Sequence, residues 1–367
     1  MTVSITTASK LFAPRRIGAI DLKHRIVMAP MTRLRATKEG VPSDLQVEMY
    51  TQRATDGGLL ITEGTLVAGE EYGLPNAPGI WNETQVEEWK KVVTGVHSKG
   101  GKIICQIAAL GRMVHPDAVE TVWAPGSQAY PATQKKFKTM EVKDIERFVG
   151  HFKQAASNAV AAGFDGVELH AGYGYIQSGS NDRTDQYGGT LPENRFRFPL
   201  QVLNAVSEVI GADRVGIRIS PFSRYQGMRE GQEASDPLSV FVPFVKAVVA
   251  AQPSLAYVHG VEFQPEGDAV VAEGLISKVE ETLDPIREVV AKSGVGFIAS
   301  GGYTPESANA HAEKQDDLIA FGRHYIPNPD LVKRIENNWP LTEYDQSTFY
   351  IPESAKGYTD FPIYTPV

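Results

Sequence analysis

The residues best suited to chemistry follow the apolar run that begins at Phe164, where His170, Tyr173 and Tyr175 stand close together among glycines. An imidazole and two phenols can hydrogen-bond a carbonyl oxygen and donate a proton to the same compound. The preceding run predicts a short buried strand that ends at His170. The pattern therefore predicts a carbonyl site at the carboxyl end of a strand, provided that other strands end beside it.

Seven further apolar runs alternate with amphipathic segments along the chain. The runs cover residues 25–30, 59–64, 102–108, 214–220, 257–262, 296–302 and 318–323, and the helical patterns cover 44–56, 84–99, 142–162, 193–210, 236–252, 277–293, 305–313 and 329–338. Continuous apolar runs are typical of strands buried on both faces of a parallel sheet. Eight runs alternating with eight helical patterns predict an α/β fold, a single (β/α)8 TIM barrel domain over residues 1–367.

Three long segments, 110–141, 172–191 and 221–235, are expected to form loops over the carboxyl ends of the strands. Residues 338–367 lack a helical period and are expected to form an irregular C-terminal cover. The alternative fold is a doubly wound sheet. It lacks support because no Gly-x-Gly-x-x-Gly follows the first predicted strand.

Composition narrows the classes of function. The chain has 367 residues, of which 42% are hydrophobic, with a net charge of -8 and a pI near 5.6. The acidic balance argues against nucleic acid and anionic membrane partners, and no run approaches the length of a membrane span. Cys105 is the single cysteine, which excludes an internal disulfide and fits a reducing compartment. We expect a cytoplasmic protein, a monomer or homodimer, that acts on a small molecule.

In a barrel, the active site lies where the strands end. The predicted strands end with Ala29, Pro30, Met31 and Thr32, with Gly64, Gln106, His170 and Arg218, and with Gly301, Gly302, Gly322 and Arg323. The last four suit a phosphate, which backbone N–H groups and a guanidinium can bind, although glycines also serve simple turns. The ends hold no lysine for Schiff-base chemistry and no metal-ligand spacing.

Ordered motifs over nearly the whole chain resemble the old yellow enzyme family of FMN-dependent ene-reductases. They include residues 11–14, 22–33, 50–54, 89–92, 181–189, 322–331 and 357–362. The resemblance implies FMN across the top of the barrel and NADPH or NADH as hydride donor. It also implies reduction of the conjugated C=C of an α,β-unsaturated ketone or aldehyde.

The resemblance also assigns roles to residues. Ala29, Pro30, Met31, Thr32, Gly64, Gln106 and Arg218 would surround the flavin ring, and Gly301, Gly302, Gly322 and Arg323 would hold its phosphate. The positive charge of Arg218 would stabilise the reduced ring. His170 and Tyr173 would hold the substrate carbonyl, with Thr32 and Tyr350 beside it. Tyr175 would act as the acid.

The chain departs from the family pattern at three places. Tyr173 stands where relatives have Asn or His, the segment before Asn181 is shorter, and Ala108 and Ala109 stand where a bulky aromatic is common. The shorter segment and the two alanines favour a bulky, secondary-metabolite-like substrate. The alternatives are a flavin-containing member that performs isomerisation, oxidation or cyclisation, and a flavin-free, phosphate-binding barrel lyase or isomerase.

Overall fold

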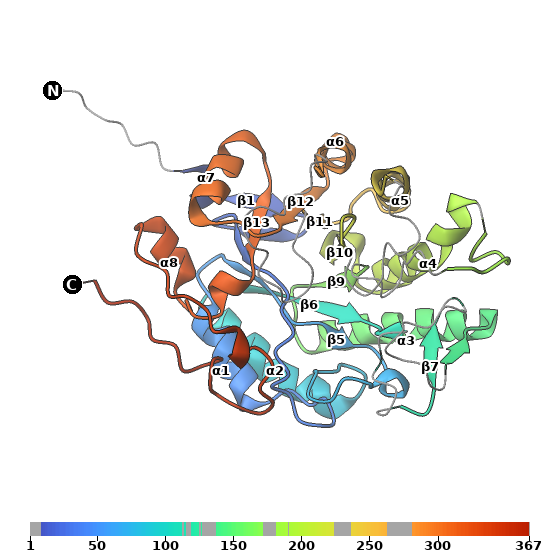
Figure 1. Ribbon diagram of the computed structural model, residues 1–367, viewed down its shortest axis with the longest axis horizontal. Coiled ribbons are helices and arrows are strands. Elements are labelled where there is room, and N and C mark those ends of the chain that lie inside the picture. Colours follow the sequence, from blue (N-terminus) through green and yellow to red (C-terminus); the bar gives the residue numbers. More distant parts are fainter. Residues whose placement is uncertain are drawn as a thin grey trace.

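A computed structural model of the chain describes residues 9–111, 114, 119–124, 126, 137–171, 181–189, 191–223, 236–262 and 281–366 (Figure 1). Its centre is a closed barrel of eight parallel strands. They are β3 (Ile26–Met28), β4 (Leu59–Ile61), β6 (Lys102–Ala108), β9 (Gly166–His170), β10 (Val215–Ile219), β11 (Tyr257–Val261), β12 (Gly296–Ser300) and β13 (Leu318–Phe321). The strands pair in chain order, and β13 closes on β3. Each lies within a predicted run, so the predicted barrel is confirmed.

Helices follow the strands and surround the barrel (Figure 1). They are α1 (Asp44–Arg53), α2 (Glu83–His97), α3 (Val142–Ala161), α4 (Pro192–Ile210), α5 (Leu238–Ala251), α6 (Asp284–Ser293), α7 (Pro305–Lys314) and α8 (Leu331–Glu336). Asn82 caps the start of α2, since its Oδ1 accepts from the Gln85 amide at 2.9 Å. The predicted start of α6 at residue 277 is wrong for residues 281–283, which are not helical. The helix begins at Asp284 because Pro285 favours a first turn.

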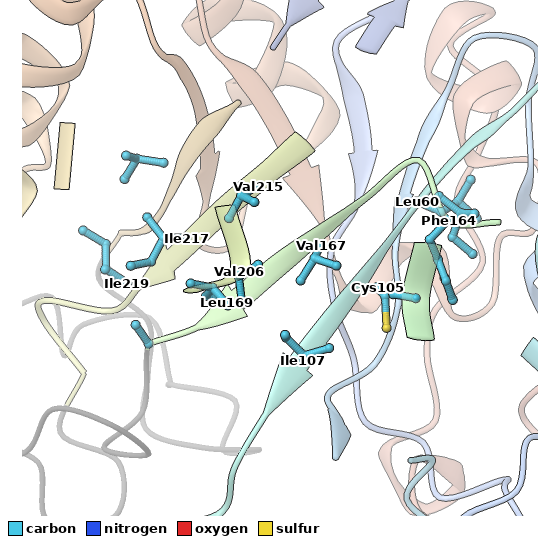
Figure 2. Packing of buried hydrophobic residues seen from close by; sticks show 14 of the residues in the cluster. Leu60, Cys105, Ile107, Phe164, Val167, Leu169, Val206, Val215, Ile217 and Ile219 are labelled. Carbon is cyan, nitrogen blue, oxygen red and sulfur yellow. The ribbon is translucent and has the colours of Figure 1, made fainter. Parts of the chain in front are cut away.

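Alternation along the strands sorts the side chains into two sets. Val167, Leu169, Val215 and Ile217 belong, with Val206 of α4, to the large buried cluster between the barrel and the helices (Figure 2). The residues between them on β9 and β10 therefore point into the barrel, because successive strand side chains face opposite sides. This geometry brings polar side chains from several strands together inside the barrel.

A two-stranded hairpin, β1 (Arg15–Ile17) and β2 (Ile20–Leu22), covers the amino-terminal end of the barrel. Its apolar side chains Ile17, Ile20 and Leu22 pack in one buried cluster with inward residues that include Leu59 and Tyr257. The sequence prediction missed this hairpin, because its strands have only three residues each. Because the hairpin closes the amino-terminal end of the barrel, the carboxyl end is the open one.

The predicted insertion at 110–141 carries a small parallel pair, β7 (Val122–Ala124) and β8 (Phe137–Thr139). The pair contacts α3 through Trp123, whose ring packs against two cations. Lys138 Nζ is 4.7 Å from the ring centroid and the Arg147 guanidinium carbon is 4.8 Å from it. The strand β5 (Thr65–Leu66) pairs in parallel with the last two residues of β6, Ile107 and Ala108. Every helix in the described ranges is too short or too polar to cross a lipid bilayer.

Three buried arginines hold the C-terminal tail against the first part of the chain. Arg35 donates to the carbonyls of Thr348, Phe349, Ser354 and Lys356, each at 2.9 Å. Arg33 and Arg53 make similar bonds, to Phe349 and Gly357 and to Tyr325, Ile326 and Tyr358. The Tyr358 ring lies 5.2 Å from the Arg33 guanidinium carbon and 4.9 Å from that of Arg35. The tail, otherwise irregular, is thus fixed by its backbone carbonyls.

Arg35→Met is expected to lower the free energy of unfolding by about 3 kcal/mol, because four tail carbonyls lose a charged donor. Urea unfolding followed by circular dichroism measures the change. The control is Arg16→Met, since the Arg16 side chain is 66% exposed and contacts only the exposed Asp21 and the nearby Gly18 carbonyl among the described residues. Equal stability of the two variants would contradict the role given to the tail contacts.

His24 makes the stability depend on pH. Its Nδ1 accepts from the Ile26 amide at 3.2 Å and its Nε2 lies 2.9 Å from Thr55 Oγ1, an arrangement that requires the neutral ring. Burial lowers the pKa of His24 to about 4. As pH falls from 6.5 towards 4, the unfolded chain binds a proton that the folded chain does not, so stability decreases by about 3 kcal/mol. Urea midpoints at pH 7 and pH 4.5 should show a smaller decrease for His24→Gln; an equal decrease would contradict this source.

Candidate active site

A cavity lies at the open, carboxyl end of the barrel. Its lining comprises Pro30, Thr32, Gly64, Leu66, Leu74, Gln106, Ala108, Leu110, His170 and Arg218. Its volume of about 140 Å³ is roughly ten times what one water requires, so the cavity has room for a ligand. Six of the predicted site residues line it: Pro30, Thr32, Gly64, Gln106, His170 and Arg218.

The floor of the cavity contains a chain of buried hydrogen bonds that the sequence prediction missed. Gln106 Nε2 donates to Glu168 Oε1 at 2.7 Å, and Glu168 Oε2 lies 2.9 Å from His259 Nδ1. His259 Nε2 lies 3.0 Å from the hydroxyl of Ser300. These four side chains come from β6, β9, β11 and β12, so the chain of bonds crosses the barrel interior.

The charge states in this region follow from burial and from neighbouring groups. Burial opposes ionisation of Glu168, but His259 and Arg218 beside it hold the pKa of its carboxyl below the usual value. Burial, with the charge of Arg218, lowers the pKa of His170 well below its usual value. Burial also lowers the pKa of His259. At neutral pH the site therefore holds a carboxylate at Glu168, a guanidinium at Arg218 and two neutral imidazoles.

Glycines keep the ends of β4, β12 and β13 open. A Cβ atom at Gly64 would lie 3.6 Å from Gln106 Oε1, on the cavity wall, and one at Gly322 would lie 3.6 Å from Met31 Sδ. Gly301 and Gly302 have φ values of +139° and +71°, which residues with a side chain rarely adopt. A Cβ atom at Gly302 would face open space. Longer side chains at Gly64 or Gly302 would fill space that a ligand could occupy.

The other predicted residues take various positions. Ala29 is buried at the end of β3. Arg323 begins a single 3-10 turn, and its guanidinium carbon lies 5.9 Å from the centroid of the Tyr344 ring. Tyr350 is 43% exposed on the tail, against Phe349. Tyr173 and Tyr175 lie outside the described residues, so their predicted roles stay predictions.

The donor set fits FMN. Gln106 supplies an amide and Arg218 a permanent cation beside the cavity, which suit the pyrimidine edge of a flavin and the negative charge of its reduced form. Gly64 leaves the wall next to Gln106 open to a flat ring. The glycines after β12 and β13 place no side chain over the backbone at a position where barrels commonly bind phosphate.

Over residues 10–342 the sequence matches the profile of the NADH:flavin oxidoreductase / NADH oxidase family. The chain belongs to this family. Flavin oxidoreductase hxnT from Emericella nidulans is 40% identical, over 98% of this chain and 99% of that protein. Chanoclavine-I aldehyde reductase fgaOx3 from Penicillium roqueforti is also 40% identical, over 96% of each chain. The solved old yellow enzyme homologue from Zymomonas mobilis has a TM-score of 0.84 at 35% identity, over 96% of this chain and 99% of that one.

The resemblance to the old yellow enzyme family is confirmed, and with it FMN as the cofactor and a nicotinamide as the hydride donor. The protein is an FMN-dependent NAD(P)H oxidoreductase. The predicted reduction of an unsaturated carbonyl compound is confirmed at the level of the family. Membership argues against the flavin-free lyase or isomerase.

Part of the cavity lining is apolar. This apolar part is formed by Leu66, Leu74, Ala108 and Leu110, whereas His170 and Arg218 are the polar residues of the same cavity. Ala109, which the sequence prediction grouped with Ala108, packs instead in the outer core between barrel and helices. Adjacent residues of an extended segment face opposite sides, so only Ala108 enlarges the cavity.

Proposed function

We propose that this enzyme reduces the conjugated C=C of a bulky α,β-unsaturated ketone or aldehyde. The observation that carries the proposal is the cavity, which joins a neutral His170 and Arg218 to an apolar wall at the open end of a flavin-family barrel. The related chanoclavine-I aldehyde reductase is named for an aldehyde substrate. Such a substrate would place its carbonyl oxygen beside His170 and its apolar body against Ala108 and Leu110, so that the polar and the apolar parts of the cavity would both be in contact with it.

The protein would hold FMN through Gln106 and Arg218 at the ring, with Pro30, Met31 and Thr32 along it. Gly301, Gly302, Gly322 and Arg323 would bind its phosphate. The chemistry that bound FMN supplies is hydride transfer, from NADPH or NADH to the β-carbon of the substrate. Arg218 favours the anionic reduced ring by its charge.

His170 would donate a hydrogen bond to the substrate carbonyl and so stabilise the negative charge that develops on oxygen. The neutral ring has one N–H, which is sufficient for this role. Tyr175 would donate the proton to the α-carbon, so that one hydride and one proton saturate the double bond. Tyr173 is proposed as the second carbonyl donor, and Thr32 and Tyr350 as residues that contact the substrate.

The test begins with the purified protein under anaerobic conditions. NADPH or NADH should bleach the visible absorption of the flavin, and an enone should restore it. A protein that is colourless and takes up no added FMN would refute the flavin assignment. Bleaching that none of a broad panel of enones and enals reverses would refute double-bond reduction and favour isomerisation, oxidation or cyclisation. Tyr175→Phe should slow the second step by about 10²- to 10⁴-fold and leave the first unchanged.

Substrate size is tested by Ala108→Trp. We expect this substitution to reduce kcat/KM for a polycyclic enone by at least about tenfold, because the indole would occupy the apolar side of the cavity. 2-Cyclohexenone, measured with the same variant, is the internal control and should be reduced at a similar rate as before. Equal effects on both compounds would contradict the assignment of Ala108 to the substrate wall.

A further inference from the structure

The buried carboxylate of Glu168 accepts a hydrogen bond from Gln106, and Gln106 lines the cavity assigned to FMN. Its side chain and that of His259 are fully buried, and those of Gln106 and Ser300 are nearly so. Gln106 and Glu168 are register partners on β6 and β9. On the other side, Glu168 pairs in register with Gly216 of β10.

Gly216 is the residue of β10 that lies between Glu168 of β9 and the side chains of β11. A Cβ atom at Gly216 would lie 2.2 Å from Cζ of Tyr257, so the Tyr257 ring occupies the place of the missing side chain. Gly216 therefore leaves no side chain of its own between β9 and β11 at this level. The distance from Glu168 Oε2 to His259 Nδ1 is 2.9 Å.

The direction of each hydrogen bond follows from the carboxylate. Ionised Glu168 only accepts, so it takes one N–H from Gln106 and one from His259. His259 then carries its proton on Nδ1, and its Nε2 accepts from the Ser300 hydroxyl at 3.0 Å. The Gln106 amide cannot exchange its oxygen and nitrogen, because two acceptors would then face each other.

We propose that Glu168 is a positioning residue for the cofactor: it fixes the Gln106 amide so that the carbonyl oxygen Oε1 is presented to the cavity as an acceptor. The Cβ position of Gly64, 3.6 Å from Oε1, places that oxygen at the cavity wall. An acceptor there selects a ligand edge that carries an N–H, as the flavin imide does. Glu168 acts only through Gln106, and the inference rests on the assignment of FMN.

The test measures FMN affinity of apoprotein by fluorescence quenching in a double-mutant cycle of Glu168→Gln and Gln106→Ala. An amide at 168 can donate as well as accept, so Gln106 is no longer restricted to one orientation. We expect Glu168→Gln to weaken FMN binding about tenfold in the wild type and less than twofold in Gln106→Ala. Equal weakening in both backgrounds, or none in the wild type, would overturn the proposal.

A second measurement needs no destabilised variant. 3-Methyl-FMN lacks the imide N–H, and we expect the wild type to bind it at least tenfold more weakly than FMN. Equal affinity for both flavins in the wild type would overturn the proposal. Glu168→Gln should narrow the difference and change the visible spectrum of bound FMN; an unchanged preference in a folded variant would also overturn it.

The matched control is Glu63→Gln. Glu63 is another fully buried carboxylate at the same end of the barrel, but it accepts from Gln46 Nε2 and from the Arg33 amide. We expect this variant to keep the preference for FMN over 3-methyl-FMN, and its loss would contradict a role specific to Glu168. Failure of the wild type to bind FMN would refute the cofactor assignment itself, which separates the two questions.

Discussion

Arg218→Met is expected to weaken FMN binding by about 10- to 100-fold, because a charge-assisted hydrogen bond contributes about 1.5–3 kcal/mol. Arg218 lines the cavity near the end of β10, in register with His170 of β9 on one side and His259 of β11 on the other. The flavin that remains bound should have a lower midpoint potential, since the cation that favours the reduced anion is gone. Apoprotein titration with FMN measures the affinity, and spectroelectrochemical titration measures the potential.

Arg214→Met is the matched control. Arg214 immediately precedes β10, at the opposite end of the strand, and donates to the carbonyls of Phe164 and Asp165 at 2.7 Å and 2.9 Å. We expect this variant to be less stable than the wild type but to bind FMN with the same affinity and potential. FMN binding by Arg218→Met at wild-type affinity would contradict the placement of the flavin.

His170→Leu is expected to slow reoxidation of the reduced enzyme by an enone about 10²- to 10³-fold, the usual effect of removing one donor to a developing oxyanion. Stopped-flow absorbance under anaerobic conditions measures this step. The FMN content should not change. His151→Leu on α3, where the ring pairs with Glu70, is the control and should leave the step unaffected.

The pH profile tests the charge state of His170. Burial and the nearby Arg218 lower the pKa of His170 well below its usual value, so the ring stays neutral throughout the physiological range. The rate of reoxidation of the wild type should therefore show no inflection near pH 6.5 that is caused by His170. The pH profiles of the wild type and of His170→Leu should have the same shape in this range. Such an inflection would mean that a charged imidazole holds the carbonyl.

The sequence was sufficient for the barrel because its strands are buried on both faces and read as continuous apolar runs. It was also sufficient for Gln106, His170 and Arg218, since each lies at or near the end of such a run and points inward. The cavity that joins them is the geometric consequence of a closed parallel barrel.

Other features carry no comparable signal. Glu168 and His259 are polar residues inside apolar runs, and only their shared inward face relates them. Alternation along β9 and β11, considered together, could have found them. The contacts of Arg35 with the tail end on backbone carbonyls more than 300 residues away, and a carbonyl acceptor leaves no mark in sequence.

The tail contacts also bear on the order of events during synthesis. Arg33, Arg35 and Arg53 leave the ribosome well before their acceptors between residues 325 and 358, which lie more than 270 residues further along the chain. Three guanidinium groups must stay hydrated until those acceptors arrive, because burial of an unpaired cation is costly. The strand β3 likewise has no partner on one side until β13 has been synthesised. The barrel can therefore close only after the acceptors up to Tyr358 have been synthesised, and chains that stop before Tyr325 should be retained by chaperones.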